Sequence, residues 1–184
     1  MVFFLLEIEV WKIGDSLAAS KFNIVSKPND GGKTQKANNR LGKAQKLQGE
    51  FWQAFGECGA SNEEYSKEFN KRKALPQHWY DLPMGNSEYH ISLTCATQRN
   101  EIGIEVYIDN NKEIYDLFYA NKDTVEENTG LKYKWQRLDN KKASRIKAIK
   151  KCDVTNQEEW EECFKWFCDN VLIIKKEFNE IYNK

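Results

Sequence analysis

The stretch that decides the fold reads Tyr89-His90-Ile91-Ser92-Leu93-Thr94-Cys95-Ala96, then Thr97-Gln98-Arg99-Asn100, then Glu101-Ile102-Gly103-Ile104-Glu105-Val106-Tyr107-Ile108. On both arms, every second residue belongs to an apolar set. The four residues between the arms are polar and short enough for a turn. Two runs of period two around a short polar turn predict a β-hairpin with one buried face.

Downstream of this hairpin the period changes to that of a helix. Over residues 110–128, apolar side chains recur on one side of a helix, and Gly130 follows as the residue that ends it. Two more strand-like runs come next, at 131–138 and 143–149. The order β-β-α-β-β predicts an α+β fold with a mainly antiparallel sheet of four or more strands.

Helices are predicted on either side of this core. Residues 40–56 carry apolar side chains at helical spacing, and Gly56 and Gly59 are expected to close that helix. Residues 60–75 suggest a further helix, and 77–87 a loop. A long helix over 156–182 opens with a Thr155/Glu158 capping box. Its apolar stripe consists of Trp160, Cys163, Phe164, Phe167, Val171, Ile174, Phe178 and Ile181. The helices 40–56, 110–128 and 156–182 are expected to pack largely on one face of the sheet.

The amino-terminal part has a different character. Residues 2–13 and 21–26 are predicted to be strands, and the Pro-, Gly- and Asn-rich residues 28–39 a linker. A lone pair of strands is marginally stable in water. We therefore divide the chain into residues 1–38, a strand pair with its linker, and residues 39–184, an α+β domain.

Bulk composition excludes several classes of protein. The 184 residues carry 28 basic and 28 acidic side chains, so net charge indicates no partner. The five cysteines include no CxxC pair, which predicts free thiols in a reducing cytoplasm. The apolar opening of the chain is too short for a signal peptide or a membrane span, so no membrane partner is expected.

The sequence predicts no catalytic, metal or cofactor site. A metal-dependent nuclease needs a (D/E)-x-K element, because carboxylates hold Mg²⁺ while the lysine steadies water or phosphate. The match, Asp139-Asn140-Lys141, falls between two predicted strands, where Asp-Asn is common turn chemistry. His78 and His90 have no predicted partner for acid–base chemistry. The chain is therefore expected not to be an enzyme.

The strongest local anomaly is charge. Residues 132–151 contain nine Lys or Arg against the single acid Asp139. The candidate contacts to nucleic acid are Lys132, Lys134, Arg137, Lys141, Lys142, Arg145 and Lys147. A row of such cations on one sheet face suits phosphate binding, since each neutralised phosphate releases counterions. Alternatively, the segment is a solvated ribbon whose charge is offset by the acidic start of the last helix.

A family resemblance adds context to these patterns. Residues 4–16, which include Trp11-Lys12-Ile13-Gly14-Asp15, and residues 21–30 resemble the end of a restriction-endonuclease-like domain of certain bacterial proteins. The remainder resembles the uncharacterised domain that follows it there. That likeness is carried by Phe51-Trp52, 102–108, 131–135, Ser144-Arg145-Ile146, and Trp160 with Trp166.

The resemblance implies a shortened form of such proteins. Residues 1–38 would be the final strands of the nuclease-like domain plus linker, and the family's acidic metal ligands would precede them. The leading hypothesis is a non-catalytic accessory domain of a restriction or phage-defence protein that contacts DNA or RNA. The alternative is a protein-interaction or assembly domain without nucleic-acid binding. It would form a homo-oligomer or join a nuclease partner through the long helix or the 77–87 loop.

Overall fold

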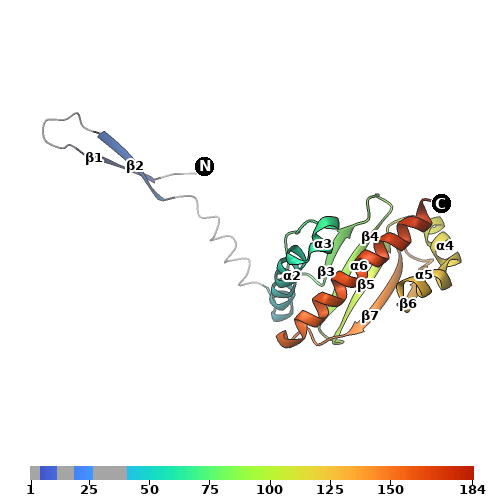
Figure 1. Cartoon of the computed structure of the whole chain (residues 1–184). Coiled ribbons are helices and arrows are strands. Elements are labelled where there is room, and N and C mark those ends of the chain that lie inside the picture. The colour runs from blue at the N-terminus through green and yellow to red at the C-terminus, as the bar shows by residue number, and fades with distance from the viewer. Residues whose placement is uncertain (1–4, 12–18, 27–40) are drawn as a thin grey trace. The chain divides into compact units, whose positions relative to one another are not determined.

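A computed structural model describes residues 5–11, 19–26 and 41–184, in two compact units that divide at Leu41. The predicted linker at 28–39 lies outside these residues. In the first unit, β1 (Leu5–Trp11) and β2 (Ala19–Ser26) form an antiparallel pair, as Figure 1 shows. Both predicted strands are therefore present. Their origin in a nuclease-like domain stays a prediction.

The second unit is built on a five-stranded antiparallel sheet in the order β3-β4-β5-β7-β6. Its strands are β3 (Trp79–Pro83), β4 (Tyr89–Ala96), β5 (Glu101–Ile108), β6 (Tyr133–Gln136) and β7 (Ser144–Lys151). The predicted hairpin is confirmed, with Tyr89 opposite Ile108 and Ala96 opposite Glu101. The predicted α+β class and the mainly antiparallel sheet are confirmed with it.

The expected loop at 77–87 is wrong in part, because it contains the edge strand β3. Pro83 favoured a loop, since proline cannot donate to a strand ladder. It occupies the last position of an edge strand, where proline is tolerated. The overlooked signal is the alternation of buried Tyr80 and Leu82 with Trp79 and Asp81.

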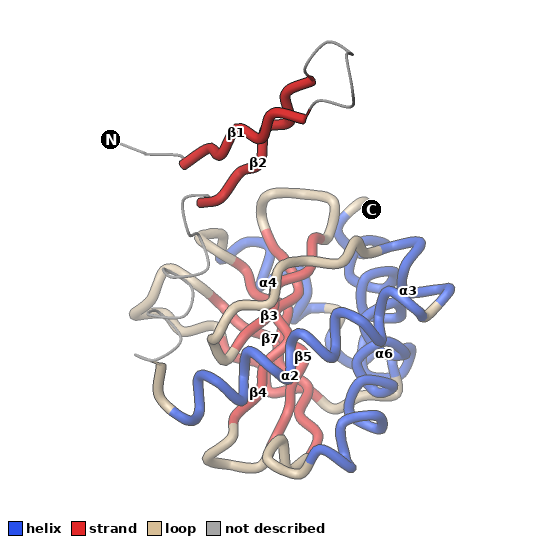
Figure 2. Tube along the Cα trace, turned by 90° about the vertical axis from the view of Figure 1, so that its left-hand side faces the viewer, coloured by secondary structure: helices blue, strands red, loops and turns tan. Residues whose placement is uncertain are grey.

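Helices of the second unit cover one face of the sheet. They are α2 (Lys43–Ser61), α3 (Glu63–Glu68), α4 (Lys112–Ala120), α5 (Lys122–Thr129) and α6 (Trp160–Tyr182), with a short 3-10 turn, η1 (Gln157–Glu159). In Figure 1, α6 crosses in front of the strands, with α2 and α3 beside one end and α4 and α5 beside the other. Figure 2 shows α6 to one side of the strands.

The core between helices and sheet is rich in aromatic rings. Phe55 of α2 is fully buried, with ring centroids 5.4 Å from Tyr80 and from Phe167. All eight residues of the predicted α6 stripe are buried, which confirms that prediction. At the far end of α6, the Tyr89 hydroxyl donates to Asn179 Oδ1 at 2.7 Å.

Two helix boundaries differ from expectation. The first helix continues past Gly56 and Gly59 to Ser61, and both glycines are buried inside it. A Cβ at Gly59 would lie 2.7 Å from the Tyr65 ring. Glycine here permits close packing and does not end the helix.

The single helix expected at 110–128 is two helices, α4 and α5, separated at Asn121. This residue leaves helical geometry at φ −105° and ψ 15°, and its side-chain amide donates to the Leu117 carbonyl. Polar side chains of this kind compete with the backbone for helical hydrogen bonds. The predicted stop at Gly130 is confirmed, at φ 67°.

The start of the last helix is capped by other residues than the predicted pair. Asn156 accepts from the Glu158 backbone N–H, and Asp153 accepts from Thr155. These caps lie where the Thr155/Glu158 capping box was expected. Thr155, however, donates its hydroxyl to Asp153 and does not cap the helix.

The prediction of five free thiols is wrong for two of them. Cys152, just after β7, and Cys163 of α6 form a disulfide, with Cα atoms 6.8 Å apart. The chain turns back between β7 and α6, which brings together two cysteines eleven positions apart. No short-spacing motif signals such a pair. Cys58, Cys95 and Cys168 are free.

Candidate functional site

The face of the sheet turned away from the helices, which we call the open face, carries the candidate site. Side chains alternate across a strand, so this face takes the residues between the core positions. Its members are Trp79, Asp81 and Pro83; His90, Ser92, Thr94 and Ala96; Glu101, Gly103, Glu105 and Tyr107; Arg145, Lys147, Ile149 and Lys151; and Lys134 and Gln136. Within residues 42–184 no helix packs on it.

At the centre of the open face lies a buried carboxylate held by two cations. The Glu105 side chain is only 5% exposed. Its Oε1 lies 3.1 Å from Arg145 Nε, and its Oε2 lies 3.8 Å from Lys147 Nζ. Burial lowers the pKa of Lys147, although the Glu105 carboxylate acts in the opposite direction. Removing one member would leave its partner's charge buried and uncompensated.

A second polar group lies on the β3 side. Ser92 Oγ donates to Asp81 Oδ1 at 2.7 Å, and His90 Nε2 lies 3.7 Å from the same oxygen. The strand register makes this group continuous with the central one, because Asp81, Ser92 and Glu105 stand opposite one another in turn. Lys147 and then Lys134 extend the row to the far edge.

Rings are exposed beside these charges. The Trp79 side chain is 38% exposed, and its ring meets His78 edge-on at 4.7 Å. The rings of His90 and Tyr107 lie 5.1 Å apart at 33°. The guanidinium carbon of Arg145 is 5.3 Å from the Tyr107 ring centre, a cation–π contact.

Between the ring groups the open face is hollowed. The hollow has a volume of about 480 Å³, and its lining includes Trp79, Thr94, Arg99 and Lys147. Gly103 lets Lys147 and Thr94, which line the hollow, pack closely over β5, because a Cβ there would lie 2.6 Å from Lys147 Cε and 2.9 Å from Thr94 Oγ1. A hollow of this size suits a small molecule or one unit of a polymer.

Part of the basic segment is occupied by acids from elsewhere in the chain. Lys132 Nζ lies 2.8 Å from Glu126 Oε2, and this hydrogen bond is the main cause of the lowered pKa of Glu126. Lys150 lies 2.6 Å from Glu162 at the start of α6, as the alternative of an offset ribbon expected. Glu105 and Glu126 of α5 offset more of the positive charge of this segment, and that alternative did not include them.

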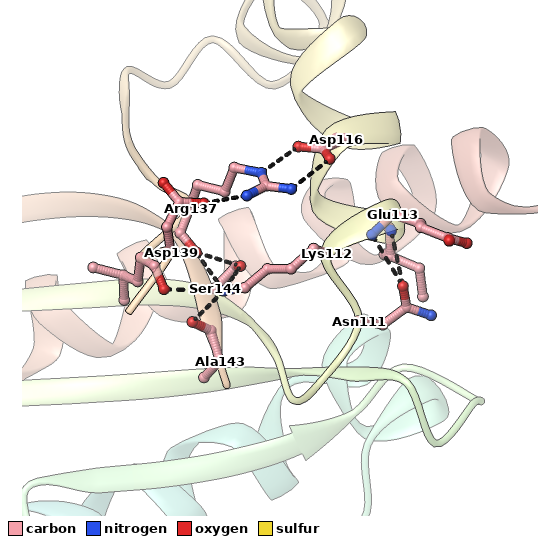
Figure 3. Close-up of polar contacts among 10 residues, drawn as sticks. Asn111, Lys112, Glu113, Asp116, Arg137, Asp139, Ala143 and Ser144 are labelled. Carbon is pink, nitrogen blue, oxygen red and sulfur yellow. Dashed lines mark hydrogen bonds and ion pairs between the residues drawn. The ribbon is translucent and has the colours of Figure 1, made fainter. Parts of the chain in front are cut away.

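Arg137 is held at the turn between β6 and β7, which Figure 3 shows. Its Nε and Nη2 atoms donate to the two Asp116 oxygens at 2.8 and 3.0 Å, and it also pairs with Asp139. The Arg137 hydrogen bond lowers the pKa of Asp116. Leu138 adopts φ 57° in the same turn. Arg137 therefore has a local structural role.

The same turn is fixed by a lysine that the sequence did not single out. Lys112 Nζ donates to the carbonyl oxygens of Arg137, Leu138 and Ala143 at 2.6, 3.2 and 3.1 Å, and to Ser144 Oγ at 2.9 Å (Figure 3). One ammonium group thus joins three backbone carbonyls and a hydroxyl of the β6–β7 turn. It holds the turn that presents Lys141 and Lys142 to solvent.

The seven predicted residues therefore fall into three groups. Lys134, Arg145 and Lys147 share the open face. Lys141 and Lys142 are exposed on the β6–β7 turn. Lys132 and Arg137 are paired with acids of α5 and α4. Sequence reasoning missed Trp79, Glu105 and Tyr107 as members of the same surface, although the alternation in 101–108 placed the last two on one face.

The described residues hold no group of three His, Cys, Asp or Glu side chains suited to a metal ion. Asp139-Asn140-Lys141 lies in a turn, as predicted, where Lys141 N–H donates to the Leu138 carbonyl. Among the helices of residues 41–184, none is both long enough and apolar enough to cross a membrane.

The sequence profile described as "Domain of unknown function (DUF4268)" matches residues 47–182, from α2 through α6. The chain belongs to this family. The match spans the five-stranded sheet and all residues of the open face, so the candidate site lies wholly inside the DUF4268 domain. No curated protein and no solved structure gave a significant match to the chain.

Proposed function

We propose that this DUF4268 domain contacts nucleic acid through the open face of its sheet, without catalysing a reaction. One observation carries the proposal: cations and exposed rings, from five strands and two turns, share one uncovered surface. Nucleic-acid surfaces offer the matching chemistry, since phosphates attract cations and bases stack on rings.

The charge on this face favours an anionic ligand. The acids Asp81, Glu101 and Glu105 are outnumbered by the cations Arg99, Lys134, Arg145, Lys147 and Lys151. Lys141 and Lys142 add to the excess at the adjoining turn. Because the chain as a whole is neutral, this local excess is a property of the face.

The best test uses cations that have no structural role. Arg145 and Lys147 hold buried Glu105, so replacing them would damage the fold. Lys134, Lys141 and Lys142 are exposed and take no part in the ion pairs of this segment. Changing these three to Glu should weaken binding to labelled oligonucleotides at least tenfold at 0.1 M salt. It should also flatten the dependence of log Kd on log salt by about one unit per lost phosphate contact.

The matched control reverses three lysines on the helical side, Lys67, Lys165 and Lys176, which lie on α3 and α6. Its net-charge change is identical. Under the proposal, the control keeps the salt dependence of the original chain. Equal losses in both triple variants, or no binding by the unaltered chain at low salt, would remove the proposal.

The biological setting we propose rests on the resemblance of residues 4–30 and not on the fold. It is a bacterial restriction or phage-defence protein in which a nuclease partner supplies the chemistry, in the cytoplasm. Nucleic-acid ligands and three free cysteines agree with that compartment. The Cys152–Cys163 disulfide argues against it, because disulfides persist mainly in oxidising compartments.

Exposed apolar side chains support the second candidate, a protein-interaction or assembly domain. Leu75 and Trp79 are 43% and 38% exposed, and Trp79, the first residue of β3, lies within the 77–87 segment first considered for this role. The aromatic stripe of α6 does not support it, since those rings are buried in the core. A salt-insensitive dimer in light scattering, with no nucleic-acid binding, would favour this candidate.

A further inference from the structure

We infer that the open face takes a single-stranded nucleic acid, whose unpaired bases stack on Trp79 and on the His90–Tyr107 pair. This rests on the proposed function and names its ligand class. The inference comes from how the rings of the open face are arranged, whereas the proposed function is tested through its cations.

Trp79 is placed as a stacking platform. It lies on the edge strand β3, where neighbouring Tyr80 and Leu82 point into the core, so its own ring stands on the open face. The His78 ring contacts it edge-on and supports it from one side. A base that has left its own stack can cover the remaining surface of the indole.

Tyr107 and His90 form a second platform. They stand opposite each other on β5 and β4, and their rings lie 5.1 Å apart at a small tilt. Arg145, opposite Tyr107 on β7, places its guanidinium beside the same ring. Rings combined with an Arg plane can accept a base while the Arg charge remains close to a phosphate.

The two platforms are offset mainly along the β-strand direction, which suits a nucleic-acid single strand that runs along the β-strands. The Trp79 row continues through Thr94 to Gly103, four residues along β5 from Tyr107. Four residues of a strand span about 13 Å. The hollow lies between the platforms, and Arg99, Arg145 and Lys147 in its lining give it positive charge. It can seat the sugar-phosphate or base that joins the two stacked positions.

A duplex fits this surface poorly. Its bases are already stacked and offer no faces to Trp79 or Tyr107. The sheet is about 19 Å wide from β3 to β6 at ordinary strand spacing, whereas the major groove is about 12 Å wide. Lys147 is only 16% exposed, so it reaches a strand lying in the hollow better than a duplex backbone outside it.

The test compares three labelled probes of equal length by fluorescence anisotropy: oligo-dT, oligo-U and a mixed-sequence DNA duplex. We expect at least tenfold tighter binding to one of the single strands than to the duplex. Trp79→Ala removes the stacking contact with one base, so it should weaken single-strand binding about 5- to 150-fold. Trp79→Phe should recover most of the lost affinity. The DNA and RNA arms decide which sugar is preferred.

The matched control is Tyr119→Ala, an exposed ring on α4 that is 46% exposed and lies off the open face. It should leave single-strand binding unchanged. Duplex binding as tight as single-strand binding, or equal losses for Trp79→Ala and Tyr119→Ala, overturns the inference. If the lysine triple variant still weakens binding in that case, the proposed function survives alone. No binding to any probe overturns both.

Discussion

The two faces of the five-stranded sheet use the same strands for opposite purposes. Against the covered face, helix rings such as Phe55 of α2 and Phe167 of α6 are fully buried and contact other rings at their edges. On the open face, Trp79 and Tyr107 keep exposed surface and lie beside cations. Aromatic residues alone therefore do not mark a binding surface. Their burial and their charged neighbours decide between core and site.

This contrast separates stability from binding. Substitutions on the covered face should cost folding free energy and leave the affinity of the folded molecule unchanged. Substitutions of exposed rings on the open face should do the reverse. The predictions below follow this division, except that a substitution at Gly103 should change both stability and binding.

The largest effect is expected for Phe55→Ala. The Phe55 ring has no exposed surface and contacts Trp52, Tyr65, Tyr80, Phe164 and Phe167. Removing it leaves a cavity that these rings cannot fill, so the free energy of unfolding should fall by about 3–5 kcal/mol. Urea unfolding followed by circular dichroism measures this loss.

Trp79→Ala serves as the comparison, since it removes a larger ring from the open face. We expect it to lower the free energy of unfolding by less than about 1 kcal/mol, because much of the ring is already in water. If Trp79→Ala destabilised the chain as much as Phe55→Ala, the ring would be part of the core and the two faces would not differ.

Gly103→Ala should affect both quantities. A Cβ at this position would lie 2.6 Å from Lys147 Cε and 3.0 Å from the Ala148 carbonyl oxygen, and backbone cannot move aside cheaply. We expect a loss of about 1–3 kcal/mol in stability. Because the methyl group would also displace Lys147 and Thr94, which line the hollow, single-strand affinity should fall in the same variant. Urea unfolding and anisotropy measure the two effects.

The double variant Gly103→Ala/Thr94→Ala distinguishes the sources of that strain. It removes the Thr94 hydroxyl, which would lie 2.9 Å from the new Cβ, but leaves the Ala148 carbonyl in place. Stability should therefore recover only in part. If Gly103→Ala alone were fully stable and its binding unchanged, neither the fold nor the binding surface would need glycine at this position.

The fold was predictable where the local sequence pattern alone determines the structure. The hairpin of β4 and β5, the α6 stripe and the stop at Gly130 follow from periodicity and from the conformational freedom of glycine. Prediction failed where tertiary contacts overrode a local rule. Gly59 continues α2 because Tyr65 packs against it, and Pro83 ends a strand because that strand is at an edge.

The candidate site was predictable only in part, for a related reason. Counting charge along residues 132–151 found Lys134, Arg145 and Lys147, which do share a face. It could not show that Arg137 pairs with Asp116, twenty-one positions earlier. Nor could it place Trp79, whose β3 strand was read as a loop. Partners distant in sequence, and the faces on which they meet, depend on the sheet order.

The smallest expected effect concerns Glu126, at the sheet edge where the two faces meet. Its carboxylate accepts from Lys132 Nζ at 2.8 Å, and from Tyr133 N–H and Trp135 Nε1 at 3.3 and 3.2 Å. These bonds, that to Lys132 foremost, lower the pKa of Glu126 below its ordinary 4.5. Glu126→Gln should cost less than about 1 kcal/mol at neutral pH, since Lys132 is exposed.

The pH dependence of that cost gives the stricter test. A carboxyl whose pKa is lower in the folded chain stabilises the fold above its unfolded pKa, and this contribution is lost as the pH falls through the folded pKa. The stability difference between the original chain and Glu126→Gln should therefore be constant near neutrality and shrink below about pH 4.5. Glu127→Gln, one position along α5, removes a charge without removing these bonds and serves as the control. A difference that grew on acidification would mean that Lys132 is not held by Glu126, and would return Lys132 to the cations available for phosphate.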